Sequence, residues 1–85
     1  MKVELRYFAS LREVLGMAFE TIDVTPEICR VGQLRRLLQA RGDVWQTALG
    51  SQRALRTACN HQMCDDEMLL SEGCEIAFFP PVTGG

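Results

Sequence analysis

The C-terminal residues combine side chains and a spacing that suit chemistry at a terminal carboxylate. Glycine has no Cβ, so Gly84 and Gly85 can pass through a channel too narrow for other residues, and they leave the final carboxylate open to activation. Pro80 and Pro81 favour a stiff, extended segment, and six residues of such backbone reach about 20 Å. The pattern predicts a domain that presents its own C-terminus to the active site of another protein.

An inert, frayed tail is the alternative interpretation of the same residues. Disordered tails are usually polar and charged, whereas residues 80–85 carry no charge except the terminal carboxylate. We therefore expect the tail to be functional. Deletion of Gly85 separates the two interpretations, because an inert tail would tolerate it.

The length and charge limit the classes of protein to which the chain can belong. With 85 residues it is expected to form one domain. A net charge of −2 argues against a nucleic-acid-binding or anionic-membrane surface. No apolar run approaches the ~20 residues of a membrane span, and the charged residues among the first six are unlike a signal peptide. A cytoplasmic protein is expected.

The four cysteines, Cys29, Cys59, Cys64 and Cys74, are expected to be reduced thiols in that compartment. Cys59 and Cys74 fall in strand-like runs and are interpreted as small core residues. Cys59, His61 and Cys64 fit no common zinc spacing, so no metal site is expected. The lone His61 near a turn is more typical of a surface residue than of a catalyst. Whether any thiol is redox-active stays open.

Alternating apolar residues predict a strand near each end of the domain. Residues 2–7 alternate charged and apolar side chains, which is typical of a strand with one buried face. Residues 74–79 alternate in the same way, so one of Phe78 and Phe79 should be buried and the other exposed or half-exposed. These two strands are the best candidates for the centre of the sheet, where they would lie parallel.

One long amphipathic helix is predicted over residues 30–41. Its inner side would carry the apolar residues Val31, Leu34, Leu37 and Leu38. A capping box formed by Ser10 and Glu13 predicts a short helix after the first strand. Asp43 is expected to cap a second short helix, in which Trp45 would anchor the core.

Further strands are predicted over residues 17–24, 55–60 and 62–64, the last as a brief edge strand. A long amphipathic helix needs one sheet face to cover it. The order of elements therefore predicts an α+β, grasp-like fold, in which a mixed sheet packs on one main helix. The domain is expected to span residues 1–79, with an extended tail over residues 80–85.

Several segments resemble the small subunit of molybdopterin synthase, a ubiquitin-like sulfur carrier with the β-grasp fold. A terminal Gly-Gly alone is a weak match, because ubiquitin-like modifiers and thiamine-pathway sulfur carriers share it. The most specific match is the terminal segment Phe78-Phe79-Pro80-Pro81-Val82-Thr83-Gly84-Gly85. Shorter matches, which extend the resemblance over nearly the full length, are Tyr7-Phe8-Ala9 with Leu11-Arg12-Glu13, Asn60, and Leu70-Ser71-Glu72-Gly73.

The resemblance implies a chemistry for Gly85. An E1-like activating enzyme would use ATP to adenylate the carboxylate of Gly85, and a sulfur donor would then displace AMP to leave a thiocarboxylate. In the active site of the large subunit, the sulfur would attack a cyclic pterin precursor, and two such transfers would build the dithiolene that holds molybdenum. The chain itself would bind no cofactor stably. The catalytic groups would belong to the partners, and the family implies a heterotetramer.

Partner binding is expected at the tail and at the aromatic residues beside it. The expected contacts are Phe8, Phe78, Phe79, Pro80, Pro81, Val82, Thr83 and Gly84. Three alternatives stay open: a sulfur carrier of another, thiamine-type pathway; a ubiquitin-like modifier joined to lysines through Gly85; and a plain binding module with an inert tail.

Overall fold

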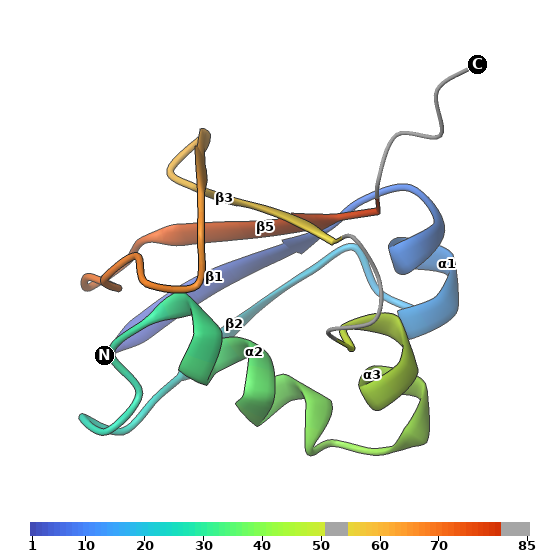
Figure 1. Ribbon diagram of the computed structural model, residues 1–85, viewed down its shortest axis with the longest axis horizontal. Helices are drawn as coiled ribbons and strands as arrows, with labels where there is room; N and C mark the ends of the chain where they lie inside the picture. Colours follow the sequence, from blue (N-terminus) through green and yellow to red (C-terminus); the bar gives the residue numbers. More distant parts are fainter. Residues whose placement is uncertain (51–54, 81–85) are drawn as a thin grey trace.

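The computed structural model describes residues 1–50 and 55–80, which form a mixed β-sheet with helices against one face (Figure 1). The strands are β1 (Lys2–Tyr7), β2 (Phe19–Asp23), β3 (Arg56–Cys59), β4 (Gln62–Cys64) and β5 (Glu75–Phe79). The helices are α1 (Ser10–Leu15), α2 (Val31–Gln39) and α3 (Asp43–Ala48). The predicted α+β class is confirmed. None of these helices has the length and apolar character that crossing a membrane requires.

The sheet has the strand order β2-β1-β5-β3-β4. At its centre β1 and β5 pair in parallel, with Leu5 opposite Ile76, whereas the other neighbouring strands pair antiparallel. The expectation that the first and last strands occupy the centre is confirmed. The helices between them in sequence supply the long crossover that a parallel pair needs.

Alternation along β1 and β5 divides their side chains between two faces of the sheet. Leu5 and Tyr7 of β1 and Phe78 of β5 point toward the helices and are almost completely buried. Their sequence neighbours Arg6 and Phe79 therefore point to the opposite face. Each of these two strands therefore contributes side chains both to the core and to the opposite face of the sheet.

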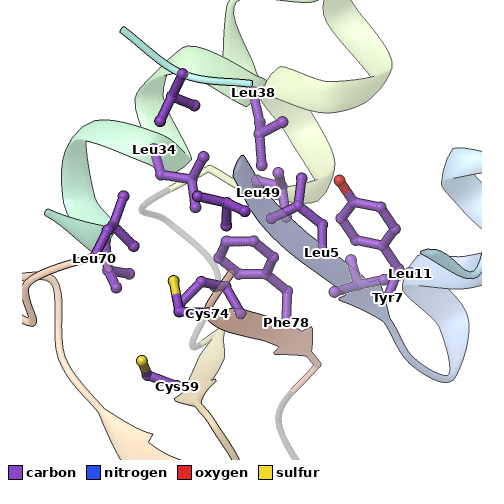
Figure 2. Close-up of a cluster of buried hydrophobic side chains, with 14 of the residues drawn as sticks. Leu5, Tyr7, Leu11, Leu34, Leu38, Leu49, Cys59, Leu70, Cys74 and Phe78 are labelled. Atoms are coloured by element: carbon purple, nitrogen blue, oxygen red, sulfur yellow. The ribbon is translucent and has the colours of Figure 1, made fainter. Parts of the chain in front are cut away.

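Aromatic rings occupy the middle of the core. Phe78 stacks on Tyr7 with 6.2 Å between ring centroids, and Tyr7 meets the edge of Trp45 at 5.6 Å. Figure 2 shows Phe78 with Leu5 and Leu49 close to its ring. Trp45 packs against this buried cluster, which confirms it as a core residue.

The main helix is shorter than predicted. α2 begins at Val31, and the side-chain oxygen of Gln33 accepts hydrogen bonds from the backbone N–H groups of Cys29 at 2.9 Å and Arg30 at 3.0 Å. These bonds satisfy donors that a helix start leaves unpaired. The inward position predicted for Leu37 is wrong, since this residue is 43% exposed. At 100° per residue, Leu34 lies at one edge of the stripe of buried residues, and Leu37 lies about 60° beyond that edge.

The capping box predicted for Ser10 and Glu13 is also wrong. Ala9 precedes α1 with φ of 54°, and Ser10 is the first helical residue, without a side-chain capping bond. Similarly, Gly42 precedes α3, and Asp43 lies within its first turn. Each short helix begins one residue earlier than its sequence indicates, because the preceding backbone turns sharply into it.

A polar network joins β1, β2 and the segment after α2. Glu20 accepts a hydrogen bond from the Tyr7 hydroxyl at 2.9 Å and two from the Arg41 guanidinium at 2.8 and 2.9 Å. That guanidinium lies 4.6 Å from the ring centroid of Trp45. Burial raises the pKa of Glu20, but the hydrogen bonds from Arg41 and Tyr7 outweigh it and hold the pKa below its ordinary value. Burial, together with Glu20, raises the pKa of Tyr7, so its hydroxyl stays a donor.

Replacement of adjacent phenylalanines tests the division of β5 between two faces. Phe78→Ala should lower the free energy of unfolding by about 3–5 kcal/mol, because it leaves a cavity where a fully buried ring stood. Phe79→Ala, the matched control, should cost about 1 kcal/mol or less. Chemical denaturation measures both values, and equal losses would contradict the assignment of the faces.

Acid denaturation tests the network at Glu20. Glu20→Gln should lower the free energy of unfolding by about 1–2 kcal/mol at neutral pH, because charge-assisted hydrogen bonds are lost. The folded pKa of Glu20 lies below its ordinary value of 4.5, so its contribution is complete above pH 4.5 and disappears as the pH falls through the folded value. The difference between variant and parent should therefore shrink in acid. A difference that stays constant, or one shared by the exposed control Glu13→Gln, would count against the network.

Candidate functional site

The candidate site is the sheet face opposite α2 and α3, which we call the open face (Figure 1). Its side chains come from alternate positions of β1, β3, β4 and β5 and from residues adjoining these strands. They surround a shallow hollow of about 460 Å³, lined by Arg6, Phe8, Ala58, His61, Met63, Glu75, Ala77 and Phe79. The hollow is therefore partly apolar and partly charged.

Phe8 and Phe79 form an aromatic pair on the open face where β5 ends. Their ring centroids lie 6.2 Å apart in an edge-to-face arrangement, and Phe8 is 48% exposed. Phe79 is partly buried, so the expectation that one of the last two phenylalanines is accessible is confirmed for this residue. Exposed aromatic side chains beside an apolar patch are typical anchors of protein interfaces.

Phe78 has a different role from its neighbour. The sequence placed it among the expected partner contacts, but its side chain is 0% exposed and packs inside the core. It therefore cannot contact a partner directly in this conformation. It instead fixes the position of β5, and with it the position of Phe79.

Local backbone geometry holds Phe8 beside β5. The N–H of Phe8 donates to the carbonyl of Phe78 at 3.1 Å, which extends the parallel ladder past the end of β1. Ala9 then adopts φ of 54° and ψ of −130°, a conformation that costs a residue other than glycine about 1–3 kcal/mol. This turn directs the chain into α1 while the ring of Phe8 stays on the open face.

A charged cluster adjoins the aromatic pair. Glu75 accepts a hydrogen bond from Nε of Arg6 at 3.3 Å, and its other oxygen lies 3.6 Å from Nδ1 of His61. Asn60 and His61 form the turn between β3 and β4 with φ of 49° and 70°. The Asn60 side chain accepts a hydrogen bond from the N–H of Glu75 at 2.9 Å. The expected surface position of His61 is confirmed, since its side chain is 82% exposed.

Cys59 and Cys74 lie on the core side of the sheet (Figure 2). Their interpretation as buried core residues is confirmed. Burial, and then the neighbouring Cys74 thiol, raises the pKa of Cys59, which makes its nucleophilic thiolate scarcer. Among residues 1–50 and 55–80, no three His, Cys, Asp or Glu side chains gather in a group that could hold a metal ion.

The residues expected to carry the chemistry lie beyond the described part of the chain. Pro80, the last described residue, is partly buried and directly follows β5. The structure does not describe the remaining expected contacts, Pro81, Val82, Thr83 and Gly84, or Gly85, where the chemistry is expected. The structure thus defines the root of the tail, while the role of Gly85 stays a prediction.

The sequence analysis missed several members of the open face. Arg6 is one of them, although the alternation along β1 puts it in the same phase as Phe8, which the sequence did place at the partner surface. Met63 is different, because it reaches the face through its pairing with Ala58 across β3 and β4. Only the register between strands brings it to the aromatic pair.

A mixed sheet with a parallel central pair, crossed by one principal helix, defines a ubiquitin-like β-grasp domain. The chain belongs to the ThiS family, whose model matches residues 5–85.

Two curated bacterial relatives are similar over almost their whole length. The molybdopterin synthase sulfur carrier subunit of Escherichia coli is 35% identical over 83 residues, which cover 98% of this chain and 99% of that protein. The protein of the same name from Haemophilus influenzae is 37% identical over 79 residues, covering 93% of this chain and 94% of that protein.

Solved structures share the fold. SAMP1 from Haloferax volcanii aligns over 100% of both chains with a TM-score of 0.77 and 26% identity. A chain from the complex of subunits 1 and 2 of molybdopterin-converting factor from Helicobacter pylori aligns over 100% of both chains with a TM-score of 0.71 and 27% identity.

Proposed function

We propose that this protein is the sulfur-carrier small subunit of a molybdopterin synthase. The observation that carries the proposal is its similarity, over almost the whole chain, to two bacterial subunits of that name. The terminal sequence from Phe78 to Gly85 supports it, because this segment combines an aromatic root, two prolines and an unhindered carboxylate.

The proposed chemistry takes place at the carboxylate of Gly85. A carboxylate resists nucleophilic attack, so an E1-like enzyme first joins it to AMP from ATP and releases pyrophosphate. Hydrosulfide released by a sulfur donor then attacks the carbonyl carbon, the bond to AMP breaks, and a thiocarboxylate remains. In the large subunit this sulfur would attack a carbon of a cyclic pterin precursor and displace an oxygen substituent from it. Water would then cleave the acyl–sulfur bond, which leaves the sulfur on the pterin and returns Gly85 to the carboxylate. Two such transfers complete the dithiolene.

The domain contributes a docking surface and a fixed root for the tail. Phe8 and Phe79 lie beside the point at which the chain leaves β5, so a partner that receives the tail meets this pair as well. The solved complex of the two Helicobacter pylori subunits supports a large subunit as that partner. In this proposal the catalytic groups belong to the large subunit and to the activating enzyme.

Intact mass measurement tests the carrier chemistry. The purified chain, incubated with ATP, a sulfur source and lysate of its host, should gain the mass difference of one oxygen replaced by sulfur. Deletion of Gly85 should abolish the gain and leave the thermal unfolding temperature within a few degrees of the parent, because the core ends with β5.

A control separates the carrier chemistry from reactions of the four cysteines. A persulfide adds a sulfur atom without loss of oxygen and is removed by thiol reductants, whereas the thiocarboxylate replaces an oxygen atom and persists. A mass gain that survives deletion of Gly85 would overturn the proposed role of this residue.

Substitutions on the open face test docking. Phe8→Ser and Phe79→Ser should each weaken binding to the large subunit by about tenfold or more, because each removes an exposed aromatic anchor. Leu37→Ser is the matched control, since Leu37 is an exposed apolar residue on α2, away from the open face. Calorimetry measures the affinities. Equal weakening by all three variants would indicate a general effect and not a docking surface.

Protein conjugation is a second candidate function, which the similarity to SAMP1 favours, because a related structure carries the name small archaeal modifier protein 1. A lysine amine would attack the same activated Gly85, release AMP and form an amide bond. In the mass experiment, larger adducts that disappear on deletion of Gly85 would support conjugation. A thiocarboxylate without adducts supports the carrier.

A further inference from the structure

One edge of the sheet is formed by a strand that can accept a further neighbour. In the part of the chain that the structure describes, β2 pairs with β1 alone. Its register with β1 continues through consecutive residues from Phe19 to Asp23, so this strand contains no bulge. It also contains no proline and no lysine, which natural proteins often place in edge strands to prevent pairing with another chain.

The hydrogen bonds between β1 and β2 show which backbone groups of β2 point outward. The N-terminal amine of Met1 donates to the carbonyl of Val24 at 2.9 Å, and the N–H of Val24 donates back to Met1 at 2.8 Å. Bonded and non-bonded pairs alternate along an antiparallel ladder. The N–H and C=O groups of Phe19, Thr21 and Asp23 therefore point away from β1. Within residues 1–50 and 55–80, these groups have no backbone partner.

The side chains of the same three residues lie on the open face. Residues opposite one another in a ladder share a face, and Phe19 and Thr21 are opposite Arg6 and Glu4 of β1. Phe19 is 67% exposed, the highest value among the large apolar side chains that the structure describes. An exposed aromatic ring thus lies beside unpaired backbone groups, a combination typical of strands that pair with another chain.

We propose that β2 pairs with β2 of a second copy of this chain, antiparallel and centred on Thr21, to form one continuous sheet. In this register Phe19 of each copy faces Asp23 of the other copy, and Thr21 faces Thr21. The outward-pointing N–H and C=O groups of all three residues would then exchange hydrogen bonds, as in the bonded pairs of an antiparallel ladder. The interface is isologous, because both molecules contribute the same residues.

The charges of β2 suit this register. Its two acidic residues do not face one another, since Asp23 faces Phe19 and Glu20 faces Ile22 of the second copy. The guanidinium of Arg6 lies 5.7 Å from the ring centroid of Phe19, so a positive charge adjoins the place that Asp23 of the second copy would take. Asp23 is accessible for this contact, because its side chain is 70% exposed.

The opposite edge of the sheet suits a second copy less well. β4 has three residues, and the acidic run Asp65, Asp66 and Glu67 follows it directly. Pairing of two β4 strands would bring two such runs close together. In β2, by contrast, the inward-pointing charge of Glu20 is already neutralised by Arg41 at 2.8 Å. The charges therefore favour the β2 edge.

The proposed pairing is compatible with a free C-terminus and does not depend on the proposed function. β1 separates β2 from β5, so the root of the tail stays uncovered in both copies. An interface made of one short strand from each copy is at the small end of interface sizes, and the dimer is therefore weak.

Sedimentation of the purified full chain at increasing concentration provides the test. The parent should change from monomer to dimer between about 10 µM and 1 mM protein. Thr21→Pro removes an outward-pointing N–H and leaves the ladder to β1 intact, so this variant should stay monomeric. Thr21→Val keeps the backbone bonds and should dimerise like the parent. Met63→Pro, a control at the β4 edge, should also dimerise like the parent.

A crosslink provides a second measurement that does not need proline in the strand. Thr21→Cys would place two thiols at a bonded pair, with about 5.5 Å between Cα atoms, a separation that a disulfide spans. With oxidised glutathione as oxidant, this variant should form covalent dimers about tenfold faster than the parent or Arg36→Cys, a control on the exposed side of α2. Circular dichroism and thermal unfolding report whether Thr21→Pro is folded.

Each outcome decides the inference. A parent that stays monomeric at ~1 mM protein overturns it and leaves the proposed function unaffected. Dimerisation of a folded Thr21→Pro variant, or loss of the dimer in Met63→Pro alone, places the interface elsewhere and overturns it as well. If Thr21→Pro does not fold, the crosslink decides, and equal rates for Thr21→Cys and Arg36→Cys overturn the inference.

Discussion

The parallel pairing of β1 and β5 is the interaction on which the rest of the structure depends. It brings the first and last strands of the domain together, so the intervening chain must cross over and cover one face with α2 and α3. The inward side chains of both strands form the centre of the core, with Phe78 stacked on Tyr7. The same pairing sets Phe8 beside Phe79 on the opposite face. The core and the open face are therefore two sides of one ladder.

The sequence predicts features that depend on local alternation. The period of two in a strand predicts that one of Phe78 and Phe79 is buried, and only the structure shows that it is Phe78. The central positions of β1 and β5 follow from their apolar inward residues. Helix starts were predicted less well. The backbone at Ala9 adopts a conformation that its side chain does not favour, so the cap expected from Ser10 does not form. Leu37 was misplaced because apolar character alone does not reveal where a helix stripe ends.

The composition of the open face depends on contacts between distant segments. Glu75, Arg6 and His61 meet only because three strands adopt one register, and the strained turn at Asn60 and His61 sets the last of them. No local pattern contains that information. The tail is the converse case, because the chemistry proposed for Gly84 and Gly85 was inferred from their lack of a side chain, without reference to the fold.

The parallel direction of β1 and β5 also determines how the domain responds to a mechanical pull. A partner that draws the chain beyond Pro80 into a narrow channel pulls along the axis of β5, parallel to β1. The backbone hydrogen bonds lie roughly across that axis, so the pull is distributed over the registered residues from Glu75 to Phe78 at once, and over the antiparallel bonds to β3 on the other side. Such shear loading resists rupture far better than a pull that opens a ladder one bond at a time. The ladder can thus bear a pull at the end of β5 while the domain remains folded.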